Sequence, residues 1–322
     1  MLWFALAIAL PARGQTDPCL QRTVAVSVVD TAAKPVTGLT PQDFHAEMKG
    51  KRVPILSAMP DESSHRVLIV LDASKSMVED EKEWSLAKSL AGEALAASPG
   101  HFQAGLIVFN DQVRVKIPVQ SGTQAARRAL DELPERPRKK DQRIGRHTAL
   151  WDALMAATEL LDPPQFGDSI YAITDGWDNA SSRGLKMLRK TLAARGVRVF
   201  AEWFGYDVLS GFPGTPEDSP LSDFLAVVGD SGGLLATIPP RPRPGTPLPN
   251  YSQLRADQLK KIRSEAQELY TAWQFVYRLD VALPAPVSRP KRWKLSIPQG
   301  RSPKPDWVLA FPAYIEACEA RH

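Results

Sequence analysis

The sequence predicts an α/β fold: a doubly wound, mostly parallel sheet, together with a small β domain formed by the N- and C-terminal strands. Apolar strands alternate with amphipathic helices from about residue 64 to residue 240, and this alternation is typical of parallel sheets covered by helices on both faces. Shorter segments with strand spacing lie on either side of this stretch, and Cys19 and Cys318 stand near opposite ends of the chain.

Composition indicates a globular protein. Of 322 residues, 43% are hydrophobic and 24% are charged, and the net charge is only +4. A chain of this length predicts roughly two domains. Nucleic-acid binders usually carry a concentrated basic stripe, and this balance does not indicate one. Since no stretch approaches ~18 consecutive apolar residues, we expect no transmembrane span.

The chain begins MLWFALAIALPARGQTDPC. The apolar block at residues 2–10 is too short to span a bilayer but suits the core of a signal peptide. Ala12 and Gly14 are small residues at the positions that precede a cleavage site. We therefore interpret residues 1–14 as a signal peptide and expect a periplasmic or secreted protein; the alternative is an apolar first strand.

The chain has only two cysteines, Cys19 and Cys318. In an exported protein we expect them to form a disulfide that ties the two ends together. Closing so large a loop is worth ~5 kcal/mol on the chain-entropy estimate. Two free thiols are the alternative.

Residues 15–63 are expected to form an N-terminal β segment. TVAVSVVD, at residues 23–30, alternates apolar and polar side chains as a strand does. DFHAEMKGKRVPILSA reads as a hairpin that turns at residues 49–51. Such a unit cannot bury both of its faces alone, so it needs a partner.

Residues 64–240 form the expected α/β domain. The run VLIVLD is nearly continuously apolar, which is typical of a strand covered on both faces. Gly196 is expected to end one of the helices. The other expected strands are HFQAGLIVFN with its hairpin partner VRVKIPV, then DSIYAITD and VRVFAEWFGY; the expected helices cover residues 80–97, 122–133, 148–161, 183–196 and 222–233.

The C-terminal part is expected to return to the β segment. Residues 241–273 are interpreted as a proline-rich linker followed by an amphipathic helix. Residues 274–322 hold three strand-like runs, QFVYRLDVAL, RWKLSIP and DWVLAF. We expect this C-terminal β segment to pack with residues 15–63, because a Cys19–Cys318 disulfide would bring both ends together.

Polar side chains gather where the expected strands end. Asp72 ends the strand VLIVLD and is followed by Ser74 and Ser76, Asp175 ends another strand, and Thr148 precedes a helix. In a doubly wound sheet, ligands bind beyond the carboxyl ends of the strands. This set offers only oxygen ligands, which suit Mg²⁺ and also Mn²⁺, whereas Zn²⁺ prefers nitrogen or sulfur.

The pattern Asp72-x-Ser74-x-Ser76, then Thr148, then Asp175-Gly176 resembles the metal-ion-dependent adhesion site of von Willebrand factor type A domains. The likeness covers about residues 64–240 and implies a von Willebrand A-like, Rossmann-like sheet. VSVVDTAAKPVTGLTPQDFHAEMKGKRVPI and YRLDVAL more loosely resemble the flanks of bacterial secreted proteins related to these domains.

The resemblance implies roles for these residues. The hydroxyls of Ser74, Ser76 and Thr148 would ligate Mg²⁺, and Asp72 and Asp175 would bind it directly or through water. An Asp or Glu of a partner protein would then complete the metal shell.

The surroundings of the site suggest residues that contact a partner. The residue before Thr148 is usually small in such domains, but here it is His147, whose ring could screen the metal or contact the ligand. PERPRKKDQRIGRH is a basic segment, interpreted as a solvated loop or as a rim that steers an acidic partner. Trp177 is equally compatible with an exposed anchor and with core packing. The expected partner-binding residues are His147, Trp177, Arg146 and Arg143.

Alternatives to a binding module are weaker. Ser74 or Ser76 could cap a helix, but a cap does not explain Thr148 and Asp175 as well. Phosphatases with a nucleophilic aspartate carry a second aspartate two residues later, where this chain has Ser74. We therefore predict a metal-dependent protein-binding module that is not an enzyme. The alternatives are an envelope scaffold with a vestigial metal site and, less favoured, a Mg²⁺-dependent hydrolase.

Overall fold

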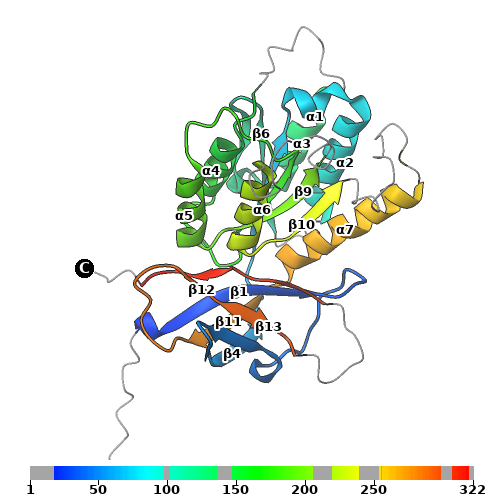
Figure 1. Ribbon diagram of the computed structural model, residues 1–322. Helices are drawn as coiled ribbons and strands as arrows, with labels where there is room; N and C mark the ends of the chain where they lie inside the picture. The colour runs from blue at the N-terminus through cyan, green and yellow to red at the C-terminus, as the bar shows by residue number, and fades with distance from the viewer. Residues whose placement is uncertain are drawn as a thin grey trace, which may run out of the picture.

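A computed structural model shows an α/β domain stacked on a smaller β domain (Figure 1). The segments interpreted as a signal peptide and as a proline-rich linker lie outside the described residues. The structure describes residues 18–97, 102–135, 147–205, 220–238, 254, 256–298 and 307–318.

The α/β domain is built on a six-stranded sheet with strand order β10-β9-β8-β5-β6-β7. Its strands are β5 (Arg66–Asp72), β6 (Gln103–Phe109), β7 (Val113–Ile117), β8 (Ser169–Thr174), β9 (Arg198–Phe204) and β10 (Leu235–Ile238). Neighbouring strands run parallel except for the β6–β7 hairpin. The predicted doubly wound, mostly parallel sheet is therefore confirmed. β10 was not expected, because its four residues are too few to show a period and it is defined by pairing with β9.

Helices cover both faces of this sheet (Figure 1). The helices are α1 (Lys75–Glu79), α2 (Glu81–Ala97), α3 (Thr123–Asp131), α4 (Leu150–Leu160), α5 (Leu185–Arg195), α6 (Pro220–Ser231) and α7 (Ala256–Gln274), with 3₁₀ turns η1 (Pro18–Leu20), η2 (Pro41–Asp43) and η3 (Val119–Ser121). Alternate side chains of a strand point to opposite faces. Ile69 thus packs in the cluster with α2, α3 and α7, and Val70 in the cluster with α4, α5 and α6. Gly196 ends α5 with φ 65°, as its position predicts.

Helix α7 packs on the sheet as well as reaching the β domain. Its apolar side chains Ala266 and Trp273 belong to the same buried cluster as Tyr171 and Phe200 of β8 and β9. At its carboxyl end, the Ala272 carbonyl accepts a hydrogen bond from the Ser27 hydroxyl of the β domain. α7 therefore connects the α/β sheet to the strands below it.

Strands from both ends of the chain build the β domain. They are β1 (Gln21–Val29), β2 (His45–Met48), β3 (Lys51–Arg52), β4 (Ile55–Pro60), β11 (Tyr277–Ala282), β12 (Lys291–Arg292), β13 (Lys294–Ser296), β14 (Val308–Ala310) and β15 (Tyr314–Ile315). β1 pairs antiparallel with β11 and β14, β11 pairs with β4, and β13 pairs with β2. The predicted small β domain of N- and C-terminal strands is confirmed, and its strands pair antiparallel.

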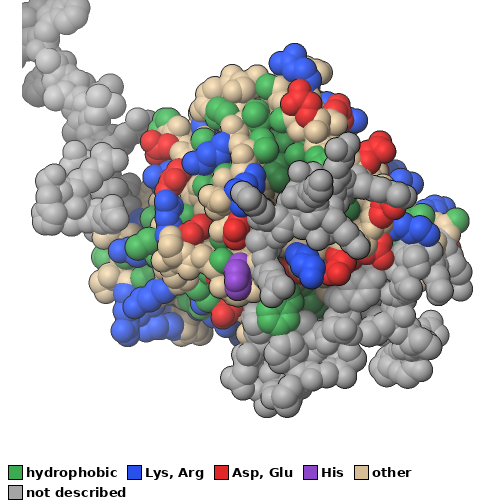
Figure 2. All heavy atoms as spheres, turned by 90° about the horizontal axis from the view of Figure 1, so that it is seen from above, with side chains coloured by type: hydrophobic (Ala, Val, Ile, Leu, Met, Phe, Trp, Pro, Cys, Tyr) green, Lys and Arg blue, Asp and Glu red, His purple; other side chains and the backbone are tan. Residues whose placement is uncertain are grey.

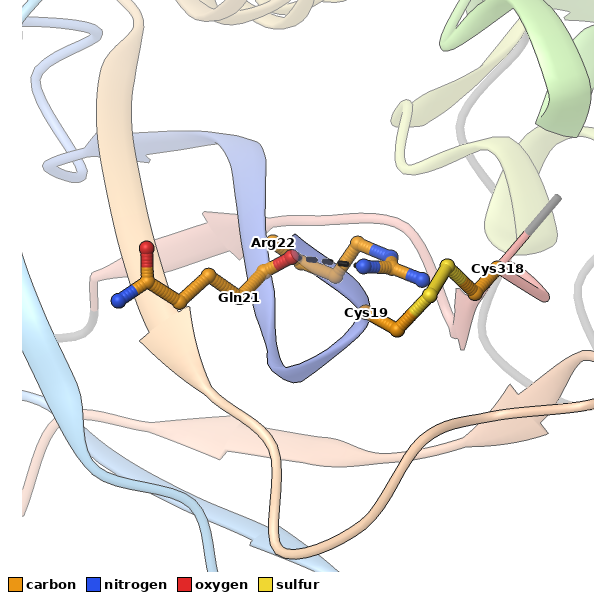
Figure 3. The surroundings of a disulfide bond; sticks show 4 residues. All are labelled: Cys19, Gln21, Arg22 and Cys318. Atoms are coloured by element: carbon orange, nitrogen blue, oxygen red, sulfur yellow. Dashed lines mark hydrogen bonds between the residues drawn. A yellow bond between two sulfur atoms is a disulfide. The ribbon is translucent and has the colours of Figure 1, made fainter. Parts of the chain in front are cut away.

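A disulfide joins the two ends of the described chain, as predicted (Figure 3). Cys19 and Cys318 are 299 residues apart in sequence, and their Cα atoms are 5.4 Å apart. The bond fixes the start of β1 beside the segment that follows β15. Among the described residues, no helix is long and apolar enough to cross a membrane.

Candidate metal-binding site

The candidate site lies where β5 and β8 end. These neighbouring strands are parallel and pair Leu71 with Ile173. Asp72 and Asp175 therefore arrive at the same edge of the sheet. Gly176 then turns the chain with φ 80°, and a side chain there would press against Trp203 and Phe224, so this turn requires glycine.

Asp72 is fully buried and accepts hydrogen bonds at both carboxylate oxygens. Its Oδ1 accepts from the Ser74 backbone N–H at 2.8 Å, and its Oδ2 accepts from the Thr174 hydroxyl at 2.6 Å. Burial, and after it the negative charge of Asp175, raises the pKa of Asp72 to about 7. The ionised carboxylate is therefore costly without a nearby positive charge.

A line of hydroxyls connects Ser74 to Asp175. The Ser74 and Ser76 hydroxyl oxygens are 3.1 Å apart, and the Ser76 hydroxyl donates to Asp175 Oδ2 at 2.5 Å. Asp175 Oδ1 also accepts from the Trp177 backbone N–H at 3.2 Å. Burial is the main cause that raises the pKa of Asp175. Four of the five expected ligands are thus joined by direct hydrogen bonds or through Thr174.

Helix capping does not account for the serines. Ser74 is the N-cap residue of α1, but its side chain makes no capping hydrogen bond there. Its hydroxyl instead faces Ser76. The side chains of both serines are directed to the carboxylates rather than to the helix.

Thr148, the fifth expected ligand, is buried on the loop before α4. Its backbone N–H donates to the Asn179 side chain at 2.7 Å, and its carbonyl accepts from the Asn179 backbone N–H at 2.9 Å. The hydrogen bonds that link the other four ligands do not include Thr148. Asn179, five residues after Thr174, therefore ties the Thr148 loop to the loop that follows β8.

The expected partner-binding residues are described in part. His147 is exposed, directly before Thr148, and Trp177 is half-buried. Arg143 and Arg146 lie outside the described residues. Asp178 accepts a hydrogen bond from the Trp151 backbone N–H at 3.2 Å, so it supports the start of α4, as a turn residue would.

Sequence reasoning missed two acidic or hydroxylated neighbours of the site, Thr174 and Glu83. Thr174 stands directly before Asp175, and its hydroxyl is hidden in a buried strand. Glu83 is buried on α2. Burial, followed by the charges of Asp175, Asp80 and Asp72, raises its pKa to about 9. The helical spacing of the sequence could have indicated that Glu83 is buried, because it lies on the same buried face of α2 as Ala87 and Leu90.

The charges at this edge fit a cation. Within the described residues, neither Asp72 nor Asp175 has a Lys, Arg or His partner at ion-pair distance. The described residues also contain no group of three or more His, Cys, Asp or Glu side chains suited to a metal. Two carboxylates with neighbouring hydroxyls match a hard cation that keeps several waters.

Figure 2 looks down on this end of the molecule. On the described part of the face, acidic and basic side chains are interspersed.

Comparison with known proteins identifies the domain. The family model of the von Willebrand factor type A domain matches residues 67–177, a range that holds every proposed ligand. No curated protein matches the sequence.

Several solved structures resemble the chain. BatB from Bacteroides thetaiotaomicron is 18% identical, with 63% of this chain and 98% of that chain covered and a TM-score of 0.42. A von Willebrand factor type A protein from Catenulispora acidiphila is 11% identical, covering 94% and 74%, with a TM-score of 0.45. Proximal thread matrix protein 1 from the mussel byssus is 17% identical, covering 69% and 49%, with a TM-score of 0.46. The family match over residues 67–177, together with the strand order and the motif at the sheet edge, shows that this chain contains a von Willebrand factor type A domain.

Proposed function

We propose that the protein is an exported, divalent-cation-dependent protein-binding module. The observation that carries the proposal is the pair of carboxylates, Asp72 and Asp175, brought to one sheet edge with hydroxyls between them and with no positive partner among the described residues. Burying like charges in this way is costly unless a cation neutralises them. Von Willebrand factor type A domains are in general interaction modules, which favours binding over turnover.

The residues that would hold the cation are Asp72, Ser74, Ser76, Thr148 and Asp175. All supply oxygen, so Mg²⁺ is the proposed ion and Mn²⁺ fits the same set. When bound, the cation would supply a Lewis-acidic attachment point for a carboxylate. The chain's own contribution would be to hold the oxygens at the edge while leaving room in the cation's shell for an incoming carboxylate.

The proposed partner is a protein that offers an Asp or Glu side chain. His147 is exposed beside Thr148 and is suited to contact that partner, and Trp177 is half-buried next to Asp175. Arg143 and Arg146 are proposed to attract the acidic partner by long-range electrostatics. These four residues would set which acidic partner is accepted.

The disulfide supports export. Disulfides form and persist in oxidising compartments and are rare in the cytosol. The Cys19–Cys318 bond thus favours a periplasmic or extracellular location.

The test compares melting temperatures in Mg²⁺ or Mn²⁺ with those in chelator. The variants are Asp72→Asn, which keeps the size of the side chain, and Asp131→Asn, a control at an exposed ion pair of α3. An ion that binds only the native state adds about 2.7 kcal/mol at a hundredfold excess over Kd. We expect a rise for wild type and the control, and none for Asp72→Asn.

The outcomes separate the candidate functions. No rise for wild type would favour a scaffold with a vestigial metal site. A rise that persists in Asp72→Asn would place the ion elsewhere and contradict the proposed ligand set. Binding of Asp- or Glu-containing peptides in Mg²⁺ but not in chelator then tests the partner. Phosphate-ester turnover that Asp72→Asn abolishes would instead indicate a hydrolase.

A further inference from the structure

A cleft of about 680 Å³ lies between the two domains, at the opposite end of the sheet from the candidate metal site. Residues 22–25 of β1 line it on the side of the β domain. The end of α5, the segment 164–166 and the end of α6 line it on the side of the α/β domain, and residues 312–316 complete it. Ligand sites often occur at domain interfaces in cavities of this size.

The body of the cleft is apolar. Its lining includes Phe166, Leu192, Val227 and Ile315. Two lining hydroxyls are already occupied, because Thr23 donates to Asp280 at 2.6 Å and Ser231 donates to the Val228 carbonyl at 2.9 Å. These two hydroxyls are therefore not available to a ligand.

Positive charge predominates around this apolar body. The lining contains four basic side chains, Arg22, Arg189, Lys190 and Arg195, and two acidic ones, Asp230 and Glu316. Arg189 is paired with Asp230, and Arg195 is paired with Asp162 outside the cleft. Lys190 is exposed and makes no ion pair with a described residue. Lys190 on α5 is thus a cation at the cleft that no described carboxylate neutralises.

The disulfide fixes one side of the cleft. Arg22 follows Cys19 by three residues, and Glu316 precedes Cys318 by two. Figure 3 shows the Arg22 side chain beside the bond, with its Nη1 donating to the Gln21 carbonyl. Burial raises the pKa of Glu316, which indicates that water is partly excluded on this side.

We propose that this cleft binds a single-chain amphiphile, a hydrocarbon chain that ends in one carboxylate. The apolar walls suit the hydrocarbon, and Lys190 suits the carboxylate. A peptide fits less well, because each of its residues brings a backbone donor and acceptor that need partners, and the lining hydroxyls of Thr23 and Ser231 are taken. The proposal does not depend on the metal site at the other end of the sheet.

The test titrates the full-length, disulfide-intact protein with dodecanoate below its micellar concentration, using calorimetry. Dodecyltrimethylammonium and dodecan-1-ol are probes with the same chain and a different headgroup charge. We expect one dodecanoate per protein, and binding of the other two that is weaker by about tenfold, because a hydrogen-bonded ion pair is worth about 1.5 kcal/mol.

Three variants locate the site. Ala193→Phe adds a ring to a residue that lines the cleft, and Lys190→Glu reverses the charge there. Lys186→Glu makes the same change one turn earlier on α5, outside the cleft lining. We expect Ala193→Phe to abolish binding, Lys190→Glu to weaken it by about tenfold, and Lys186→Glu to leave it nearly unchanged. Melting temperatures establish that each variant is folded.

Several results would overturn the proposal. They are absence of dodecanoate binding to wild type, undiminished binding by folded Ala193→Phe, and equal affinity for all three probes. Equal losses in Lys190→Glu and Lys186→Glu would also contradict it, because they would show that net charge, and not the cleft, attracts the ligand. Mg²⁺ and chelator should not change the affinity, which keeps this test distinct from that of the metal site.

Discussion

The two ends of strand β5 carry charge in opposite ways. At its amino end, Arg66 is buried and faces the buried Asp168, with Nε donating to Oδ1 at 2.8 Å and Nη2 donating to Oδ2 at 2.5 Å. Arg66 Nη2 also reaches the carbonyls of Leu161 and Pro163, both at 2.7 Å. This arrangement satisfies both charges within the protein.

At its carboxyl end, β5 delivers Asp72 to a second carboxylate, Asp175. Both carboxyl groups have raised pKa values, and burial is the largest cause of the increase in each case. Hydrogen bonds from Thr174, Ser74 and Ser76 orient the carboxylates but supply no positive charge. The same strand thus has a neutralised end and an end with excess negative charge.

The difference separates an end whose charges are satisfied within the protein from an end that we propose to bind a cation. A buried ion pair with every group bonded needs nothing from outside. Buried carboxylates without a counter-charge cost stability, and their arrangement is useful if a cation arrives. Four substitutions test this contrast, in descending order of expected effect.

Asp168→Asn should cause the largest loss of stability. It leaves Arg66 buried with an uncompensated charge, which typically costs ~3–5 kcal/mol. Urea unfolding followed by tryptophan fluorescence measures this loss. Asp131→Asn is the matched control, because its partner Arg127 is 45% exposed and Asp131 is 60% exposed, so we expect a change below ~1 kcal/mol. Equal losses of stability in the two variants would show that the buried Arg66–Asp168 pair contributes no more to stability than the exposed pair does.

Glu202→Gln should increase stability at alkaline pH. Glu202 is fully buried on β9, accepts a hydrogen bond from Tyr171 at 3.0 Å, and burial raises its pKa from 4.5 to about 8. The native state therefore keeps a proton that the unfolded state has lost, so wild-type stability falls as the pH rises through this window. We expect Glu202→Gln to be more stable than wild type by ~2–3 kcal/mol near pH 9 and about equal near pH 4.

Thermal unfolding across this pH range measures the Glu202 effect. Glu159→Gln is the control, since Glu159 is 47% exposed. Because Glu202 packs under α7 and away from the candidate ligands, its effect should be the same with Mg²⁺ and with chelator. A gain for Glu202→Gln that depended on Mg²⁺ would contradict the separation between the core and the metal site.

Asp72→Asn should stabilise the metal-free protein by ~1–2 kcal/mol near pH 8, because it removes one of two neighbouring buried charges. Asparagine can still accept from the Ser74 backbone N–H, so the local hydrogen bonds survive in part. In saturating Mg²⁺ the order should reverse, with wild type the more stable. Urea unfolding in chelator and in Mg²⁺ measures which of the two proteins is the more stable in each condition. A gain in stability that Mg²⁺ does not reverse would show that Asp72 is a buried carboxyl group without a role in metal binding, as Glu202 is.

Much of the fold could be predicted because its pattern is local. VLIVLD is a nearly continuous apolar run, DSIYAITD has an apolar centre, and Gly196 marks a helix end. β10 was not predictable, since a strand of four residues acquires its identity by pairing with β9. The disulfide was predictable from composition, because the chain offers only one possible pair.

The candidate site, like the fold, contains residues that the sequence could predict and residues that it could not. Asp72 and Asp175 stand directly at strand ends, so chain order and sheet topology suffice to bring them together. Thr174 and Glu83 required the structure, because their relation to Asp72 depends on which side of a strand or helix they face. The cleft between the domains could not be predicted, since its walls come from segments far apart in sequence whose approach depends on domain packing.

Ser76→Ala should have the smallest effect on stability and still reveal the metal. Ser76 is exposed, and its hydroxyl donates to Asp175, so its loss in chelator should cost ~0.5–1.5 kcal/mol. The control is Ser57→Ala, which removes a hydroxyl that donates to Asp280 at 2.6 Å on β11. Both variants lose one hydrogen bond to a carboxylate, so their melting temperatures in chelator should fall by similar amounts. In Mg²⁺ only Ser76→Ala should show a reduced rise, because only that hydroxyl lies at the edge of the sheet where the charge is unbalanced. Equal rises in both variants would remove Ser76 from the ligand set and leave it as a bridge that holds Asp175 in place.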